Sequence, residues 1–206
     1  MHDAAGNITQ QTDARGVVTL YQYDALNRLT NNIFPANPAL NIIYAYDMTT
    51  SGNIGIGRLT ALQDAGGLIG YKYDARGNLG EQLRFVTVAG IEQDESLKYT
   101  YDNANQLTSI GYPDGFSISY SRNNAGQITG VNLTIGTQPP MVLASNIHYL
   151  PFGPLKNLTW GNGIQLNRQY NQDYQLTTQK FTSWAKHLSY DANGNIKTVT
   201  IVCLAT

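Results

Sequence analysis

The stretch Tyr71-Lys72-Tyr73-Asp74-Ala75-Arg76-Gly77-Asn78-Leu79 decides the fold of this chain of 206 residues. Its first half alternates tyrosine with another residue, which is the period-two pattern of a half-buried strand. Its second half is rich in turn formers, because Asp and Asn side chains bond the nearby backbone and Gly or Asn tolerates a positive φ. The closing leucine starts a new apolar segment. The stretch therefore predicts a strand, a turn and a second strand.

The same unit returns along the chain. With the aspartate position as a phase mark, the marks are Asp3, Asp24, Asp47, Asp74, Asp102, Ser121, Asn171 and Asp191. Neighbouring marks mostly lie 19 to 28 residues apart, and the one gap of 50 residues has room for a degenerate copy at Ile147-His148-Tyr149…Gly153-Pro154-Leu155. A fixed motif at such a period indicates a repeat architecture.

We assign a structural role to the residues that carry the repeat. They are Tyr21, Tyr23, Asp24, Tyr44, Tyr46, Asp47, Tyr71, Tyr73, Asp74, Gly77, Asn78, Tyr99, Tyr101, Asp102, Tyr120, Tyr190, Asp191, Gly194 and Asn195.

The expected fold is all-β. A single hairpin cannot bury an apolar face, so neighbouring units must stack edge to edge. We expect residues 1–206 to form one array of about eight or nine units, with incomplete first and last units and ~16 to 18 strands. A sheet of that length twists, which predicts a curved, spiralling antiparallel sheet. The tyrosines are expected to form rows across adjacent strands.

The amino-acid composition argues against several classes of function. Charged residues make up 13% of the chain, against a typical value of about 25%, and the formal net charge is −1. The 13 Lys and Arg residues form no basic stripe, which argues against nucleic-acid binding. Cys203 is the only cysteine, so the sequence offers no disulfide framework and no cysteine-based zinc site. No signal peptide or membrane span is visible in the sequence.

Tyr-x-Tyr-Asp-x-x-Gly-Asn-Leu and Gly-Arg-Leu-Thr at this spacing resemble the YD repeats of the RHS family. The resemblance extends from Asp3 to Ile196. It implies strand-turn-strand units that spiral into a hollow β-shell. In bacterial RHS proteins and in the C component of insecticidal toxin complexes, such a shell encloses a C-terminal toxin. Related shells occur in the teneurins, which act in cell adhesion.

The chain also departs from this family pattern. The family's core closes with an Asp-Pro-x-Gly segment near its self-cleavage site, whereas this chain contains no Asp-Pro and only a superficial echo at Pro151-Phe152-Gly153-Pro154. Because the sequence enters the repeat in mid-unit and the apparent strand Thr198–Val202 has no later strand to pair with, we expect a piece of a longer protein. The resemblance thus predicts shell material without self-cleavage or toxin activity.

Several candidate sites have a structural alternative. The Gly52–Gly57 run resembles a phosphate loop, but it lacks the following Lys-Ser/Thr, which favours an inserted turn. His2, His148 and His187 share no short spacing, which favours surface or strand positions over a metal or base role.

The recurring aspartates could form a calcium ladder. Each unit offers about one carboxylate, however, which favours a turn-capping role over a metal site. The tyrosine rows, with Trp160 and Trp184, could stack on sugar rings if they face solvent, although packing against one another is favoured.

Two functions from different classes remain. The first is a structural segment of an RHS-type shell that encapsulates a toxin or polypeptide cargo, with no chemistry and no cofactor of its own. The alternative is an extracellular module that recognises cell-surface carbohydrate or protein through exposed aromatic rows. The expected partners are the remainder of a larger RHS protein or its cargo, and the chain itself through its terminal strands. The expected location is outside the cell or at its surface, within a larger protein.

Overall fold

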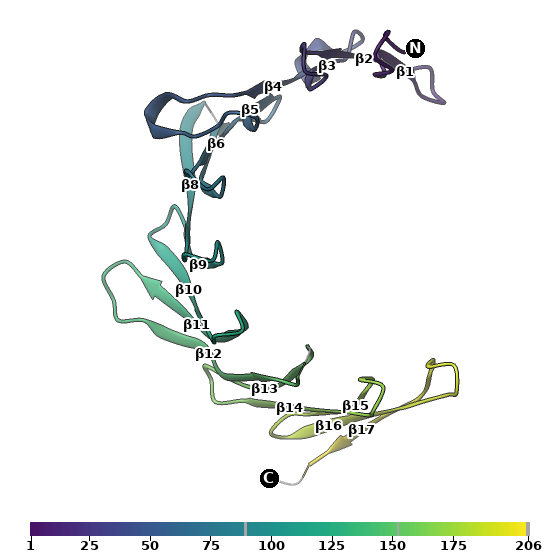
Figure 1. Cartoon of the computed structure of the whole chain (residues 1–206), viewed down its shortest axis with the longest axis vertical. Coiled ribbons are helices and arrows are strands. Elements are labelled where there is room, and N and C mark those ends of the chain that lie inside the picture. The colour runs from purple at the N-terminus through teal and green to yellow at the C-terminus, as the bar shows by residue number, and fades with distance from the viewer. Residues whose placement is uncertain (89, 152, 205–206) are drawn as a thin grey trace. The chain divides into compact units, whose positions relative to one another are not determined.

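The computed structural model describes residues 1–88, 90–151 and 153–204, and Figure 1 traces the strands in chain order. The described residues form 17 strands and two short 3₁₀ helices, so the all-β prediction is confirmed. Hydrogen-bonded neighbours are consecutive in the chain and antiparallel, as in a succession of hairpins.

The chain divides into two compact units. Unit 1 comprises residues 1–105 and 110–114, and unit 2 comprises residues 106–109 and 115–206. The strands of unit 1 are β1 (Gln10–Thr12), β2 (Val18–Tyr23), β3 (Leu29–Ile33), β4 (Ile42–Tyr46), β5 (Leu59–Asp64), β6 (Gly67–Tyr73), β7 (Leu79–Val88) and β8 (Ile91–Tyr101). Its 3₁₀ helices are η1 (Pro38–Leu40) and η2 (Thr50–Gly52).

Unit 2 continues in the same manner. Its strands are β10 (Phe116–Arg122), β11 (Ile128–Ile135), β12 (Met141–Tyr149), β13 (Leu155–Trp160), β14 (Gln165–Tyr170), β15 (Leu176–Lys180), β16 (Trp184–Tyr190) and β17 (Ile196–Cys203). Strand β9 (Leu107–Gly111) is divided between the two units. Whether the chain acts as one array stays a prediction.

A bulge follows most of the motif turns. In the β6–β7 hairpin, Lys72 pairs with Glu81 and Tyr73 pairs with Leu79, so one residue of β7 has no cross-strand partner in β6. The same shift occurs at the corresponding position of β2–β3, β4–β5, β10–β11, β14–β15 and β16–β17. Since a bulge bends its strand and increases local twist, the repeat builds this deformation into successive hairpins.

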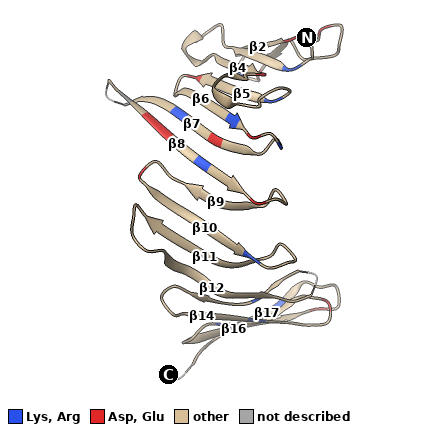
Figure 2. Cartoon of the chain, turned by 60° about the vertical axis from the view of Figure 1, so that its left-hand side comes forward, with Lys and Arg blue, Asp and Glu red and all other residues tan. Residues whose placement is uncertain are grey.

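Each unit has little buried core. In unit 2, Ala144, Ile147, Leu158 and Leu166 form a small apolar cluster across β12, β13 and β14. In unit 1, the buried residues include the polar Asn53 and Thr60. Charged side chains are sparse and most of the ribbon in Figure 2 is uncharged. Contacts between hairpins must therefore supply much of the stability that a second layer would otherwise give.

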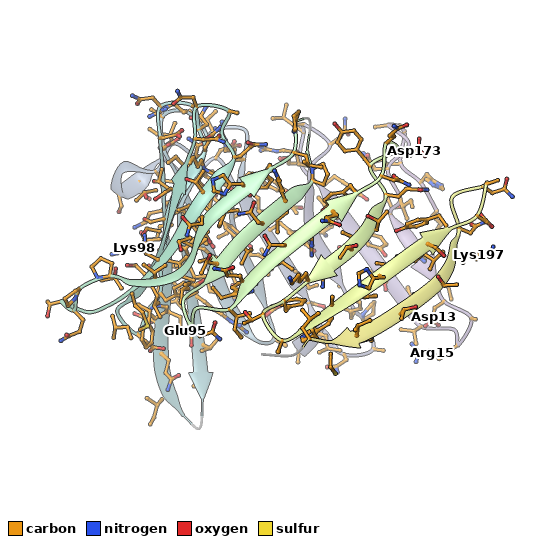
Figure 3. All side chains as sticks on the ribbon, turned by 90° about the horizontal axis from the view of Figure 1, so that it is seen from below. Asp13, Arg15, Glu95, Lys98, Asp173 and Lys197 are labelled. Carbon is orange, nitrogen blue, oxygen red and sulfur yellow. The ribbon has the colours of Figure 1, made fainter. Side chains whose placement is uncertain are left out.

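Strand β17 has an unprotected edge among the described residues. It pairs with β16 on one side, and all eight of its residues are exposed. Its Val199 and Ile201 are β-branched and apolar, and Lys197 at its start is the charged side chain on it (Figure 3). Such an edge is a template for pairing with another chain.

We predict that a protein made of these 206 residues associates through β17 at high concentration. Thr200→Lys should raise the fraction of monomer, because a charge in the middle of an edge strand opposes strand pairing. Sedimentation velocity over a concentration series measures this. Thr178→Lys, on the interior strand β15, is the matched control and should leave the association unchanged. A monomer at every concentration for the unmodified chain would contradict the prediction.

Candidate functional site

The motif turn is a six-residue structure held by the side chain of its first residue. We number its positions one to six, from Asp74 to Leu79. Asp74 Oδ1 accepts backbone N–H bonds from Arg76 (2.8 Å) and Asn78 (2.9 Å), and Asp74 Oδ2 accepts a bond from Asn78 Nδ2 (3.0 Å). Gly77, at position four, has a φ of 85°, which glycine adopts without a steric penalty. The carboxylate thus closes the turn on its own backbone.

The same turn recurs in both units. Position one accepts the N–H bonds of positions three and five in the turns that begin at Asp3, Asp24, Asn123, Asn171 and Asp191. Asp102 accepts the corresponding bond from Ala104 (2.8 Å). Asp13 forms the same structure in the turn between β1 and β2 (Figure 3), a copy that the sequence analysis missed because no tyrosine precedes it.

One phase mark was wrong. The turn after β10 begins at Asn123, not at Ser121, because Asn123 Oδ1 accepts the bonds from Ala125 and Gln127 (both 3.0 Å). Tyr120 therefore occupies the first tyrosine position of its unit, and Arg122 occupies the second. The missed signal was the spacing to the glycine, since Asn123 lies three residues before Gly126, as Asp74 does before Gly77.

The degenerate copy also folds as a motif turn. The backbone N–H of Leu150 bonds Pro154 O (2.9 Å), and the N–H of Gly153 bonds Leu150 O (3.2 Å). These match the Asp74–Asn78 and Gly77–Asp74 backbone bonds. Phe152, part of the Pro-Phe-Gly-Pro stretch, lies outside the described residues.

The turn hydrogen bonds favour ionised aspartates. Asn78 lowers the pKa of Asp74 through its side-chain and backbone N–H bonds, and Arg28 lowers that of Asp24, mainly through its backbone N–H. The pKa of Asp191 is lowered in the same manner by Asn195. These shifts follow from hydrogen bonds that only the charged form accepts in full.

In six of the repeats, the second tyrosine connects its repeat to the preceding one. Tyr73 Oη donates to the backbone carbonyl of Leu59 (2.8 Å), which is position six of the turn before. The equivalent bonds run from Tyr23 to Ile8 (3.0 Å), Tyr46 to Leu29 (2.8 Å), Tyr101 to Leu79 (3.0 Å), Tyr170 to Leu155 (2.8 Å) and Tyr190 to Leu176 (2.8 Å).

Arg122 makes the same contact at the place where other repeats have their second tyrosine. With arginine in place of the second tyrosine, its Nη2 donates to the carbonyl of Leu107 (3.1 Å), again position six of the preceding turn. Burial raises the pKa of Tyr46, Tyr73 and Tyr101. A tyrosine hydroxyl is already protonated at neutral pH, so all three can act as donors.

The first tyrosines of the units behave differently. Tyr21 Oη donates to Gln11 Oε1 (3.1 Å), and Tyr44 Oη accepts a bond from Asn32 Nδ2 (3.3 Å). Tyr71 and Tyr99 occupy the same position on β6 and β8. The aromatic pair among the described residues is Phe181 with Trp184, at 4.3 Å between ring centroids, and it includes no tyrosine. Hydroxyl bonds, more than stacked rings, thus carry the tyrosine contacts.

Neighbouring turns are also linked along their margin. The Arg28 guanidinium bonds its own Asp24 (Nε–Oδ2, 2.7 Å) and both carboxylate oxygens of Asp47 (3.0 and 2.6 Å), and it lies over the Tyr46 ring. These carboxylates raise the pKa of Arg28, with the bond to Asp47 contributing most. This bridge connects two successive turns.

The insertion after Asp47 fills a gap in strand pairing. The side chain of Asn53 donates to Tyr71 O (2.9 Å) and accepts from Tyr73 N (2.8 Å), so its amide pairs with β6 as a neighbouring strand would. The Gly52–Gly57 run therefore forms an inserted loop against the sheet. This favours the inserted turn over the phosphate loop as the interpretation of this stretch.

The remaining candidates stay separate. His148 Nδ1 lies near Asn146 O (2.8 Å), His187 Nδ1 lies near Thr178 Oγ1 (3.2 Å), and His2 forms a backbone bridge with Ile8. Within the described part of the chain, no group of three or more His, Cys, Asp or Glu is arranged to hold a metal ion. Over the same residues, no helix is long and apolar enough to cross a membrane.

These features define a class of protein: a repeat sheet of strand-turn-strand units, most of which are bonded to the preceding one through a tyrosine. The RHS Repeat family model matches residues 2–31, which include the turns at Asp3 and Asp24. No curated protein sequence gives a significant match. Residues 2–31 are thus similar to an RHS repeat.

Solved structures share its fold. The TcdB2–TccC3 complex matches 100% of the chain with a TM-score of 0.88 at 17% identity. The Tc holotoxin pore of Photorhabdus luminescens with a substitution in TccC3 matches 100% with a TM-score of 0.87 at 18% identity. TcdB2–TccC3–Cdc42 matches 100% with a TM-score of 0.87 at 17% identity. The chain spans only 11% or 12% of the length of these proteins, and at this identity the likeness shows the fold alone.

We predict that Tyr73→Phe lowers the free energy of unfolding by about 1 kcal/mol, because the part-buried Leu59 carbonyl loses its partner. Chemical denaturation followed by circular dichroism measures this. Tyr71→Phe removes a hydroxyl from the same strand and is the matched control, with a smaller expected effect. Equal losses for the two variants would contradict a specific role for the second tyrosine.

We predict that Asp74→Ala destabilises the protein at pH 7 and that Asp74→Asn restores most of the loss, because an amide oxygen accepts the same backbone bonds. The folded pKa of Asp74 is lowered, so its ionised form stabilises the protein above the unfolded pKa of about 3.9, and this contribution is lost as the pH falls through the folded value. The difference in melting temperature between wild type and Asp74→Ala should therefore shrink below about pH 4.

Calcium provides the control for this account of Asp74. The melting temperatures of the wild type and of both Asp74 variants should be the same with and without Ca²⁺. A calcium-dependent rise confined to the wild type would favour the metal interpretation instead.

Proposed function

We propose that this chain is a structural wall segment of an RHS-type β-shell that encloses a polypeptide cargo. The observation that carries the proposal is the bond to position six of the preceding turn, which six second tyrosines and Arg122 make. In these contacts, one repeat supplies the donor for a backbone carbonyl of the repeat before it. Repeats can therefore be added in one direction without a separate core. Such an array suits a wall.

The thin core supports the same role. A sheet with few fully buried apolar side chains leaves apolar residues on its surface, among them Ile43, Leu68 and Phe85 in unit 1. Large apolar patches on soluble proteins usually mark contact with another protein. In a shell wall, one such face would meet the enclosed polypeptide. The cargo, or the remainder of a larger RHS protein, is the proposed partner, and delivery outside the cell is the proposed setting.

The carbohydrate alternative has less support. The second tyrosines are part-buried and their hydroxyls are bonded to backbone carbonyls, which leaves them poorly placed to stack on a sugar ring. Trp160 is 44% exposed, but it lies on β13 without a stacked aromatic neighbour among the described residues. Selective binding on a glycan array, abolished by Trp160→Ala, would favour this alternative over the shell.

The shell proposal can be tested by a graft. Residues 1–206 replace the segment of the TcdB2–TccC3 complex that aligns with them, and electron microscopy shows whether a closed shell forms. We expect closure and protease resistance of the C-terminal region of TccC3. The matched control carries Tyr73→Phe and Tyr101→Phe in the graft and should close less often. A folded graft that leaves the C-terminal region as sensitive to protease as the free region would contradict the proposal.

A further inference from the structure

In five of the motif turns, the side chain at position five lies against position four of the next turn. Asn78 Nδ2 donates to Asn105 Oδ1 (3.0 Å), and Asn7 Nδ2 donates to Asn27 Oδ1 (2.9 Å). In both pairs a short amide at position five meets an asparagine at position four of the following turn. The amide-to-amide bond bridges the two turns directly.

Longer side chains meet glycine at the same place. A Cβ placed on Gly77 would overlap the guanidinium of Arg58, and one on Gly126 would overlap the amide of Gln106. A Cβ on Gly194 would lie 3.0 Å from Gln175 Nε2. Glycine at these positions therefore provides the positive φ and also the space that the preceding side chain occupies.

The sequence follows this division through the array. Asparagine at position five precedes asparagine at position four in the pairs Asn7–Asn27 and Asn78–Asn105. Arginine or glutamine precedes glycine in the pairs Arg28–Gly57, Arg58–Gly77, Gln106–Gly126, Gln127–Gly153 and Gln175–Gly194. Two of these five pairs lack the contact, because a Cβ on Gly57 or Gly153 would meet no neighbouring atom. In the expanded turn of Gly57, Arg28 binds Asp47 instead.

The exception has no position-five donor. Pro154 has no polar side chain, and the next turn carries Tyr174 at position four with a φ of 60°. Tyr174 Oη instead bonds back to Pro151 O (3.1 Å), so the contact between these two turns is made from the other side. These two adjacent turns therefore remain linked although the usual pair of side chains is missing between them.

We propose that position five of each motif turn selects the unit that can follow it, with short amides selecting asparagine and long side chains selecting glycine at the next position four. The surface formed by positions five and six is thus a recognition surface whose partner is another strand-turn unit of matching type. Asn195 accordingly suits a neighbouring unit of the form Tyr-x-Tyr-Asp-x-x-Asn. This inference rests on turn geometry and not on cargo enclosure, so either can fail without the other.

The test is a compensatory exchange within the chain. Asn78→Gln should lower the apparent melting temperature by about 2 °C or more, because the longer side chain meets Asn105 and the bridging bond is lost. Asn105→Gly should also lower it, since the bond from Asn78 loses its acceptor. The double variant recreates the glutamine–glycine pair of Gln106 and Gly126, and we expect it to be more stable than the sum of the two single losses predicts.

The mirror exchange uses the next pair along. Gln106→Asn and Gly126→Asn should each lower the melting temperature, and together they should recover part of the loss by forming an asparagine pair. Asn195→Gln is the control for the intrinsic cost of glutamine at position five, because the side-chain bond of Asn195 shown in the structure is to its own Asp191. Strictly additive losses in both double variants would overturn the proposal.

Discussion

The hydrogen bond from the second tyrosine of one unit to the position-six carbonyl of the unit before it is the interaction on which this structure depends. A backbone carbonyl removed from water without a partner costs more than the net value of the bond that would satisfy it. The bulge that follows most of the motif turns interrupts regular pairing near position six, and the phenol reaches this carbonyl from the neighbouring strand. Arg122 preserves the bond with a different functional group, so the donor and its reach matter more than the aromatic ring.

Other features of the repeat follow from this bond. The tyrosine must leave its strand at a fixed place, and the motif turn fixes that place through the position-one side chain, which bonds two backbone N–H groups of its own turn. A turn held by its own side chain needs no core beneath it, which is consistent with the small apolar cluster of unit 2 and the polar buried residues of unit 1. The stability of such an array is approximately a sum over units and their interfaces. A change at one interface should therefore have local consequences.

The contacts between turns add selectivity to this uniform scheme. The bond to the position-six carbonyl is the same wherever it forms, so it cannot distinguish one neighbour from another. The position-five side chain varies in length and chemistry, and the space at the next position four varies with it. A repeat protein whose units were interchangeable would be prone to register errors and to exchange of elements between copies. Matched pairs such as Asn78 with Asn105 and Gln106 with Gly126 provide a physical basis for a defined order.

The sequence by itself determined the strand-turn-strand unit, because tyrosine alternation, turn chemistry and period are local properties. The capping role of Asp74 could also be predicted from the sequence, since an Asx turn is made within six residues. The sequence analysis misplaced the turn of Asn123, where arginine replaces the marker tyrosine and hides the phase. Only the tertiary structure decided what the tyrosines do. Their hydroxyls meet carbonyls 14 to 22 residues away, and that distance is set by strand pairing and bulges, which no local pattern specifies.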